Sequence, residues 1–164
     1  MTPSQARNAI KKSLKAIIDP KPSKADKEKI WRYFENQCAY CGCELNPNDR
    51  KAHLDHVVAE AEGGSNQLCN LILTCAECNG DEKREKDWQI FLLKKCHEDN
   101  PNDNLSETPK YQKRYNKITR WITEQGGSAM LMSEQQAQLE SAFNTVDALY
   151  SNVVEQLRNQ HKTN

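Results

Sequence analysis

The chain has 164 residues, of which 37% are apolar, 28% are charged and seven are cysteines. This length suits one ordinary domain, or a small module with helical flanks, and it excludes two large domains. The sequence has no long apolar run, so we expect neither a signal peptide nor a membrane span. Cysteines in such a chain are expected to be reduced, as in a cytoplasmic protein, where they more often bind metal than form disulfides.

Basic and acidic side chains balance at 23 each, so the net charge does not by itself indicate a polyanionic partner. Their distribution is uneven. Residues 1–33 contain nine Lys or Arg and three acids, and residues 110–120 contain five Lys or Arg and no acid. In the second run we select Lys113, Arg114 and Lys117 as candidate nucleic-acid contacts. The alternative is that these Lys-rich helices are simply solvated.

Two helices are predicted before the first cysteine. Apolar residues recur with a period close to 3.6 over residues 5–18, and the sequence from Asp19 to Pro22 ends this helix. Ser23 is placed to cap a second helix, which runs from Lys24 to about Asn36.

Between Cys38 and Asn79 the composition changes, and six of the seven cysteines lie there. Two short apolar segments, 53–58 and 68–74, lie between turn-forming residues and predict two strands joined by irregular loops. After Gly80 the apolar spacing becomes helical again.

Two further helices are predicted near the C-terminus. One spans Pro109 to Gln125 and is stopped by a pair of glycines. The other runs from Ser133 to about Gln160 and carries a single apolar stripe. This stripe packs on the N-terminal helices, on a second copy in a homodimer, or on a larger protein partner, and the sequence leaves these alternatives open.

Two CxxC pairs are the strongest motif in the sequence. Cys38 and Cys41 are separated from Cys75 and Cys78 by 33 residues, and together they supply four thiolates for one tetrahedral Zn²⁺. A redox role would explain one pair and leave the other unexplained. A four-sulfur site has no open coordination position, so we expect it to hold the fold rather than to react. The other three cysteines are interpreted as packing residues.

Several polar residues follow one another in an ordered pattern around the second CxxC pair. The pattern consists of Asp55-His56, Gly63-Gly64, Asn70-Leu71 and Cys75-x-x-Cys78-Asn79, followed by Lys83. It resembles the zinc-bearing subgroup of the HNH, or ββα-metal, endonuclease family, over about a third of the chain. The family name expects His at the position of Asn79, so the pattern is of the HNN type.

This resemblance implies an α+β, mostly helical fold. A central ββα-metal module with the four-cysteine zinc site would occupy residues 37–97, between an N-terminal helical region, 1–36, and a C-terminal helical region, 98–164. We expect these segments to form a single compact unit.

Elementary chemistry gives the polar residues plausible tasks in cutting a phosphodiester, which needs a base for water and a cation for the developing charge. His56 has the titration range of a general base at neutral pH. Asp55 and Asn79 offer oxygen ligands that suit Mg²⁺ or Mn²⁺. The resemblance implies the same roles, with His56 as the base, Asp55 and Asn79 on the metal, and Asn70 keeping the base oriented.

Three points remain open at this stage. Asp55 and His56 point to opposite faces of a regular strand, so a bulge or a strand end is needed if both are to reach one phosphate. His53 is interpreted as a third metal ligand, a phosphate contact or a packing residue. Lys83 and Arg84 either contact phosphate or lie on a solvated helix face.

The resulting hypothesis is a metal-dependent endonuclease that hydrolyses DNA and, as the family implies, leaves 5′-phosphate and 3′-hydroxyl ends. It would be a bacterial or phage protein, and it would serve as the nuclease component of a restriction or anti-phage defence system. The alternative from another class is a zinc-binding module that holds nucleic acid or protein without cutting.

Overall fold

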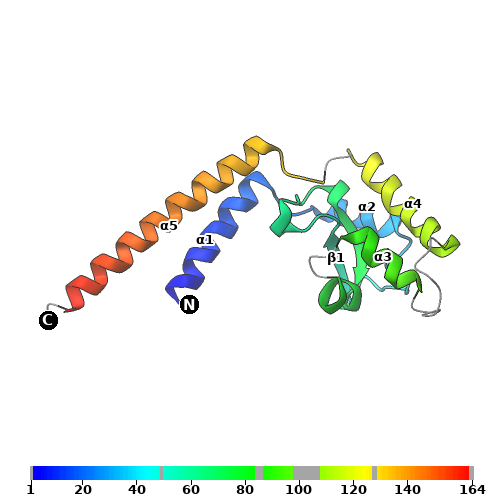
Figure 1. Cartoon of the computed structure of the whole chain (residues 1–164), viewed down its shortest axis with the longest axis horizontal. Coiled ribbons are helices and arrows are strands. Elements are labelled where there is room, and N and C mark those ends of the chain that lie inside the picture. The colour runs from blue at the N-terminus through cyan, green and yellow to red at the C-terminus, as the bar shows by residue number, and fades with distance from the viewer. Residues whose placement is uncertain (1, 49, 84–86, 98–107, 127–128, 163–164) are drawn as a thin grey trace. The chain divides into compact units, whose positions relative to one another are not determined.

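The computed structural model describes residues 2–48, 50–83, 87–97, 108–126 and 129–162. The chain divides into two compact units, one made of Met1–Pro20 with Leu131–Asn164 and the other of Lys21–Met130. Figure 1 gives the order of the elements along the chain. Within the described ranges, no helix combines the length and apolarity needed to cross a bilayer.

The first unit consists of α1 (Pro3–Ile18) and α5 (Ser133–Lys162), which lie side by side (Figure 1). Lys11 forms an ion pair with Asp147, and its ammonium lies 5.4 Å from the centre of the Phe143 ring. Large apolar side chains stay exposed on both helices; they are Ile10, Ile17, Leu149, Val153 and Leu157. A partner for this apolar surface remains a prediction.

The second unit is built on an antiparallel hairpin of β1 (Ala52–His56) and β2 (Leu71–Cys75). Its register is regular from Ala52 opposite Cys75 to His56 opposite Leu71. All five residues of β2 are buried, as their apolar composition requires. Both predicted strands are present, but the second begins later than its apolar run because Leu68–Asn70 forms a 3₁₀ turn.

Helices surround this hairpin. They are α2 (Lys24–Tyr33), α3 (Trp88–His97) and α4 (Pro109–Glu124), and a π-helical turn spans Cys78–Glu82 directly after β2. The predicted cap of α2 is confirmed, because the Ser23 side chain accepts a hydrogen bond from the backbone N–H of Asp26. The expected fold class, a mostly helical α+β protein with helices flanking a central hairpin, is confirmed.

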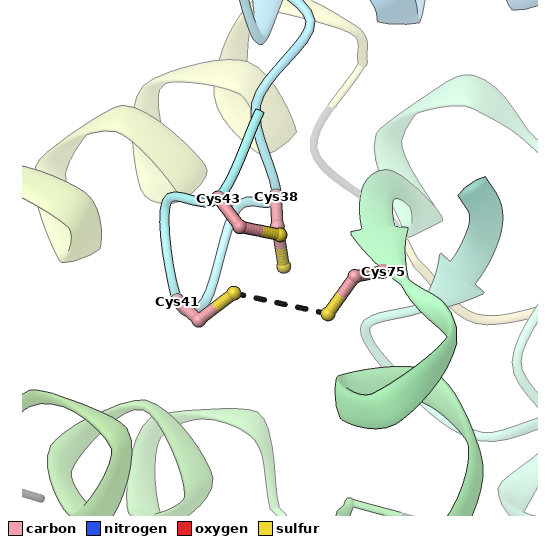
Figure 2. A group of neighbouring side chains, drawn as sticks. All are labelled: Cys38, Cys41, Cys43 and Cys75. Carbon is pink, nitrogen blue, oxygen red and sulfur yellow. Dashed lines mark hydrogen bonds between the residues drawn. The ribbon is translucent and has the colours of Figure 1, made fainter. Parts of the chain in front are cut away.

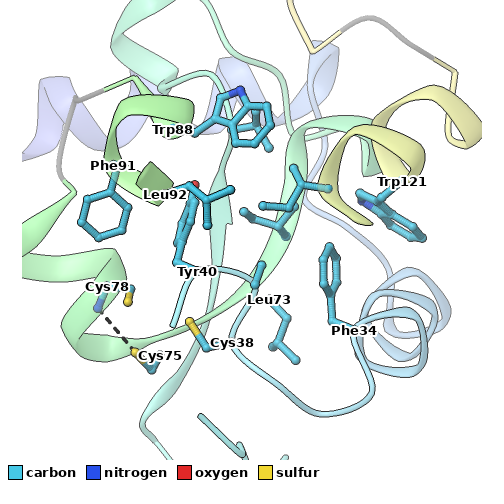
Figure 3. Close-up of a cluster of buried hydrophobic side chains, with 14 of the residues drawn as sticks. Phe34, Cys38, Tyr40, Leu73, Cys75, Cys78, Trp88, Phe91, Leu92 and Trp121 are labelled. Carbon is cyan, nitrogen blue, oxygen red and sulfur yellow. Dashed lines mark hydrogen bonds between the residues drawn. The ribbon is translucent and has the colours of Figure 1, made fainter. Parts of the chain in front are cut away.

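Trp121 of α4 joins three elements of the core (Figure 3). Its indole N–H donates to the carbonyls of Leu68 and Leu71, at 3.0 and 2.8 Å, and its ring lies against Tyr33 and Phe34 from the end of α2. The helices α2 and α4, which the sequence assigned to separate flanking regions, therefore share one core with the hairpin. The division into three segments stays a prediction.

The two faces of α3 allow a matched stability test. Leu92 is fully buried, whereas Ile90 on the same helix is 57% exposed. Leu92→Ala should lower the free energy of unfolding by about 2–5 kcal/mol, because it removes buried contacts and leaves a cavity. Ile90→Ala should change it by less than about 0.5 kcal/mol. Urea unfolding of both variants measures this, and equal effects would contradict the described packing.

Candidate metal centre and active site

The first cysteine pair lies in a tight turn, which we call the cysteine loop (residues 38–43). The Cys38 N–H donates to the Cys43 carbonyl and the Gly42 N–H donates to the Cys38 carbonyl, both at 2.9 Å. The Ala39 N–H donates to the Leu73 carbonyl at 2.8 Å and so attaches the loop to β2. Gly42 has a φ of 76°, which explains the glycine at this turn.

Arg114 of α4 holds the cysteine loop from outside. Its guanidinium donates to the carbonyls of Tyr40 and Cys41, each at 2.7 Å. A Cβ at Gly42 would lie 2.3 Å from Arg114 Nη2, so any other residue there would displace this guanidinium from its position. The basic run of the sequence predicted Arg114 as a nucleic-acid contact, but its guanidinium lies on the loop backbone.

Four cysteine sulfurs converge beside this loop (Figure 2). The Sγ atoms of Cys38, Cys41, Cys43 and Cys75 all lie within 4.8 Å of one another, and those of Cys41 and Cys75 are 3.7 Å apart. A tetrahedral site with Zn–S bonds of about 2.3 Å places its sulfurs about 3.8 Å apart. The cluster therefore fits a structural zinc ion in both donor chemistry and spacing.

A fifth sulfur adjoins this cluster. Cys78 is 1% exposed, and its N–H donates to Cys75 Sγ at 3.5 Å (Figure 3). The thiols of Cys38 and Cys41 raise the pKa of Cys78. The CxxC spacing predicted Cys78 as the fourth ligand, with Cys43 as a packing residue. Cys43 was missed although it lies only two residues after Cys41. The choice of Cys78 remains a prediction.

Neighbouring thiols in this cluster shift one another's pKa values. Interaction with the Cys41 thiol, helped by burial, raises the pKa of Cys38 to about 11. Interactions with the thiols of Cys38 and Cys78 lower the pKa of Cys41. Among the thiols whose pKa is shifted, Cys41 is the one whose pKa is lowered, and the pKa values of Cys38, Cys43 and Cys78 are raised. A zinc ion, which binds thiolates, must release the remaining protons, so zinc affinity should rise with pH.

The fourth ligand can be identified by a pair of variants. Cys78→Ser should reduce bound zinc and the free energy of unfolding, because zinc binding is part of the folding free energy. Cys43→Ser should retain one zinc per chain, since Cys43 is exposed and four sulfurs remain. Mass spectrometry under native conditions counts the metal. Loss of zinc in Cys43→Ser together with full retention of zinc in Cys78→Ser would make Cys43, and not Cys78, the fourth ligand.

Asp55 lies in a buried ionic network. Its Oδ2 is 2.8 Å from Lys83 Nζ and accepts a hydrogen bond of 3.3 Å from the Tyr40 hydroxyl. Burial raises the pKa of Asp55, and the Lys83 ammonium offsets part of that increase. Lys83 also donates to the His56 carbonyl at 2.7 Å. One ammonium thus fixes two adjacent residues of β1.

Lys83 is only 1% exposed, so its ammonium faces this network rather than solvent. The sequence suggested that Lys83 contacts phosphate, whereas its ammonium is buried against Asp55. Arg84, selected for the same reason, lies outside the described residues.

His56 is the last residue of β1, and the regular pairing up to this position shows no bulge. Its side chain therefore takes the face opposite Asp55. There its Nε2 lies 3.1 Å from the Oδ1 of Asn66, which comes from the loop after the strand. Asn66 was not among the candidate residues, because only the folded loop brings it to the imidazole.

Asn70 fastens the same loop. It is fully buried, its Oδ1 accepts from the Val58 N–H at 2.8 Å, and its Nδ2 donates to the carbonyls of Val58 and Ser65 at 3.0 and 2.8 Å. A Cβ at Gly64 would lie 1.9 Å from the Val58 carbonyl oxygen, so the loop closes too tightly for any other residue there. Asn70 therefore fixes the loop that follows His56, and its role in orienting the base stays a prediction.

The remaining candidates lie at the surface to different degrees. Asn79 is half-buried, one residue after Cys78 in the π-helical turn. His53 is exposed on β1, and Lys113 is exposed on α4. Lys117 forms an ion pair of 3.0 Å with Glu35.

Comparison with known protein families finds a match for the part of the chain that contains this site. Residues 38–85, which contain the cysteine loop, the hairpin and the π-helical turn, match the HNH endonuclease model. This part of the chain belongs to the HNH endonuclease family. HNH endonucleases act on nucleic acid and typically use a divalent metal, and the cysteine cluster of this HNH region is compatible with a structural zinc ion.

A curated protein is similar to the chain over a somewhat longer range. The CRISPR-associated endonuclease Cas9 of Corynebacterium diphtheriae is 37% identical over 71 residues, which is 40% of this chain and 6% of that protein. The chain thus matches only a small part of the length of this relative.

Proposed function

We propose that the HNH region hydrolyses DNA phosphodiester bonds, with His56 as the general base. The observation that carries this proposal is the environment of His56, which ends β1 directly after the buried Asp55 and whose imidazole contacts Asn66. The match of residues 38–85 to the HNH endonuclease family supports a nuclease rather than a passive zinc module.

The contact with Asn66 suits one tautomer of His56. With the Asn66 carboxamide oxygen as acceptor, Nε2 donates its ring proton and Nδ1 is left as the acceptor. A neutral imidazole in this tautomer takes a proton from water through Nδ1, and the imidazolium that results keeps its hydrogen bond to Asn66. Lys83 fixes the His56 backbone and Asn70 fixes the following loop, so the ring has a defined direction.

Asp55 and Asn79 are the residues that would hold a catalytic Mg²⁺ or Mn²⁺. Their carboxylate and carboxamide oxygens are the ligand types that such hard ions prefer. When bound, the ion supplies positive charge to the phosphate as its negative charge grows. With Asn79 at the last motif position, the site is of the HNN type. His53, exposed on the same strand, is a candidate for contact with this ion or with the substrate.

We further propose that the products carry 5′-phosphate and 3′-hydroxyl ends and that the chain is a nuclease component of a restriction or anti-phage defence system. The similarity to a CRISPR-associated endonuclease supports the second part.

The role of His56 is tested against its neighbour on the same strand. His56→Ala should lower the rate of plasmid cleavage at least about 100-fold, because the base is lost. Zinc content and the thermal unfolding midpoint should stay nearly unchanged, since the ring is only half-buried. His53→Ala, at an exposed position of β1, is the comparison: a small loss of rate fits a supporting role for His53, and a loss as large as that of His56→Ala would make His53 a contact of the ion or the substrate. Cleavage by His56→Ala at the parental rate would exclude it as the base.

Metal binding by Asp55 is tested by Asp55→Asn. This change should raise the Mg²⁺ concentration for half-maximal cleavage about 10-fold or more, because it removes an anionic ligand. Asp87→Asn is the control, since Asp87 caps α3 and Asn retains that capping ability. Mn²⁺ titration by calorimetry gives a readout independent of cleavage. Identical Mn²⁺ binding in the parent and in Asp55→Asn would contradict a ligand role.

A further inference from the structure

A cleft of about 250 Å³ lies on the second unit, away from the hairpin residues discussed above. It is bounded by the end of α2, the cysteine loop and the first half of α4. Buried apolar residues, Phe34, Ala39 and Ile118 among them, line part of it. Its basic lining residues are Lys110, Lys113, Arg114 and Lys117.

The three lysines of this cleft follow one face of α4. Their spacing is three and then four residues, which places them in one row. The row spans about 10 Å, comparable to the rise of about three nucleotides along one DNA strand. Arg114 adds a fourth positive charge, although its guanidinium is held by the cysteine loop. The cleft is therefore strongly positive on one side.

Glu35 is the one acidic side chain among the described residues that line the cleft. It lies two residues after the end of α2 with a φ of 55°, and Asn36 has the same φ. This left-handed conformation is unusual for residues other than glycine. The Glu35 carboxylate lies 3.0 Å from Lys117 Nζ, and the pKa of Glu35 is lowered by that contact and by the charge of Lys113. Among the described residues that line the cleft, Glu35 thus supplies the negative charge that faces the lysine row.

We propose that this cleft binds phosphate groups of nucleic acid and that the Glu35 carboxylate occupies the position that a phosphate takes. The inference rests on the proposed function for the class of ligand, but the site is separate from the hydrolytic residues. A bound phosphate displaces Glu35 from Lys117 and Lys113. Glu35 therefore weakens binding, and nucleic acid must compete with a carboxylate already on the protein.

The experiment measures binding without cutting. The full chain carrying His56→Ala is titrated with a short fluorescent DNA duplex, without added Mg²⁺, at several salt concentrations. Glu35→Gln in this background should bind about two- to fivefold more tightly, as expected for removing a solvent-exposed ion-pair partner. Lys113→Ala and Lys117→Ala should each weaken binding and reduce the slope of log affinity against log salt by about 0.9.

Glu28→Gln is the matched control. Glu28 is an exposed glutamate of α2 that pairs with Lys24 and does not line the cleft, so its loss should leave affinity within about twofold. Zinc content and circular dichroism establish that every variant is folded, and Lys117→Gln replaces Lys117→Ala if the latter is not. Unchanged affinity and salt slope in Glu35→Gln and in both lysine variants would overturn the proposal. The binding titration does not depend on cleavage. If the parental protein failed to cleave DNA in a separate assay, that result would count against the proposed hydrolysis and not against the phosphate-binding cleft.

Discussion

The contact between the sulfur atoms of the cysteine loop and those at the end of β2 is the constraint on which the HNH region depends. The loop precedes the hairpin in sequence and Cys75 ends it, so this contact closes a segment of almost forty residues at both ends. Cys78 begins the π-helical turn, and Asn79 follows it directly. The position of a proposed metal ligand is therefore set by the adjoining sulfur cluster, and a structural ion there would act on the reaction only by fixing this backbone.

Lys83 complements this constraint from the other end of the π-helical turn. Its ammonium contacts the Asp55 carboxylate and the His56 carbonyl, so the turn is attached to β1 at the two residues that the proposed mechanism uses. A buried carboxylate without a partner would be strongly destabilised, and Lys83 supplies the compensating charge. The same charge lies next to the position proposed for a divalent cation. The Lys83 ammonium and a divalent cation repel each other, so both can lie at Asp55 only if they share its carboxylate or if the ammonium moves away.

Patterns within the sequence predicted the elements well and the directions of side chains less well. Capping at Ser23 and the 3.6-residue period identified the helices, because these signals are local. The apolar run at 68–74 did not reveal that its first part is a 3₁₀ turn, since both conformations bury the same residues. Lys83 and Arg114 looked like surface cations, yet one is buried on Asp55 and the other holds the cysteine loop. Such partners are far apart in sequence, and only tertiary packing brings them together.

The attachment of α4 to the cysteine loop has a consequence for the size of the autonomous folding unit. The family match ends at residue 85, but Arg114 and Trp121 supply hydrogen bonds to backbone carbonyls of the loop and of the segment leading into β2. A fragment cut at the family boundary would leave these carbonyls to water and expose the apolar surface that α4 covers. We therefore expect a piece that folds alone to extend through α4, so that a helix from beyond the family match is an integral part of the HNH region.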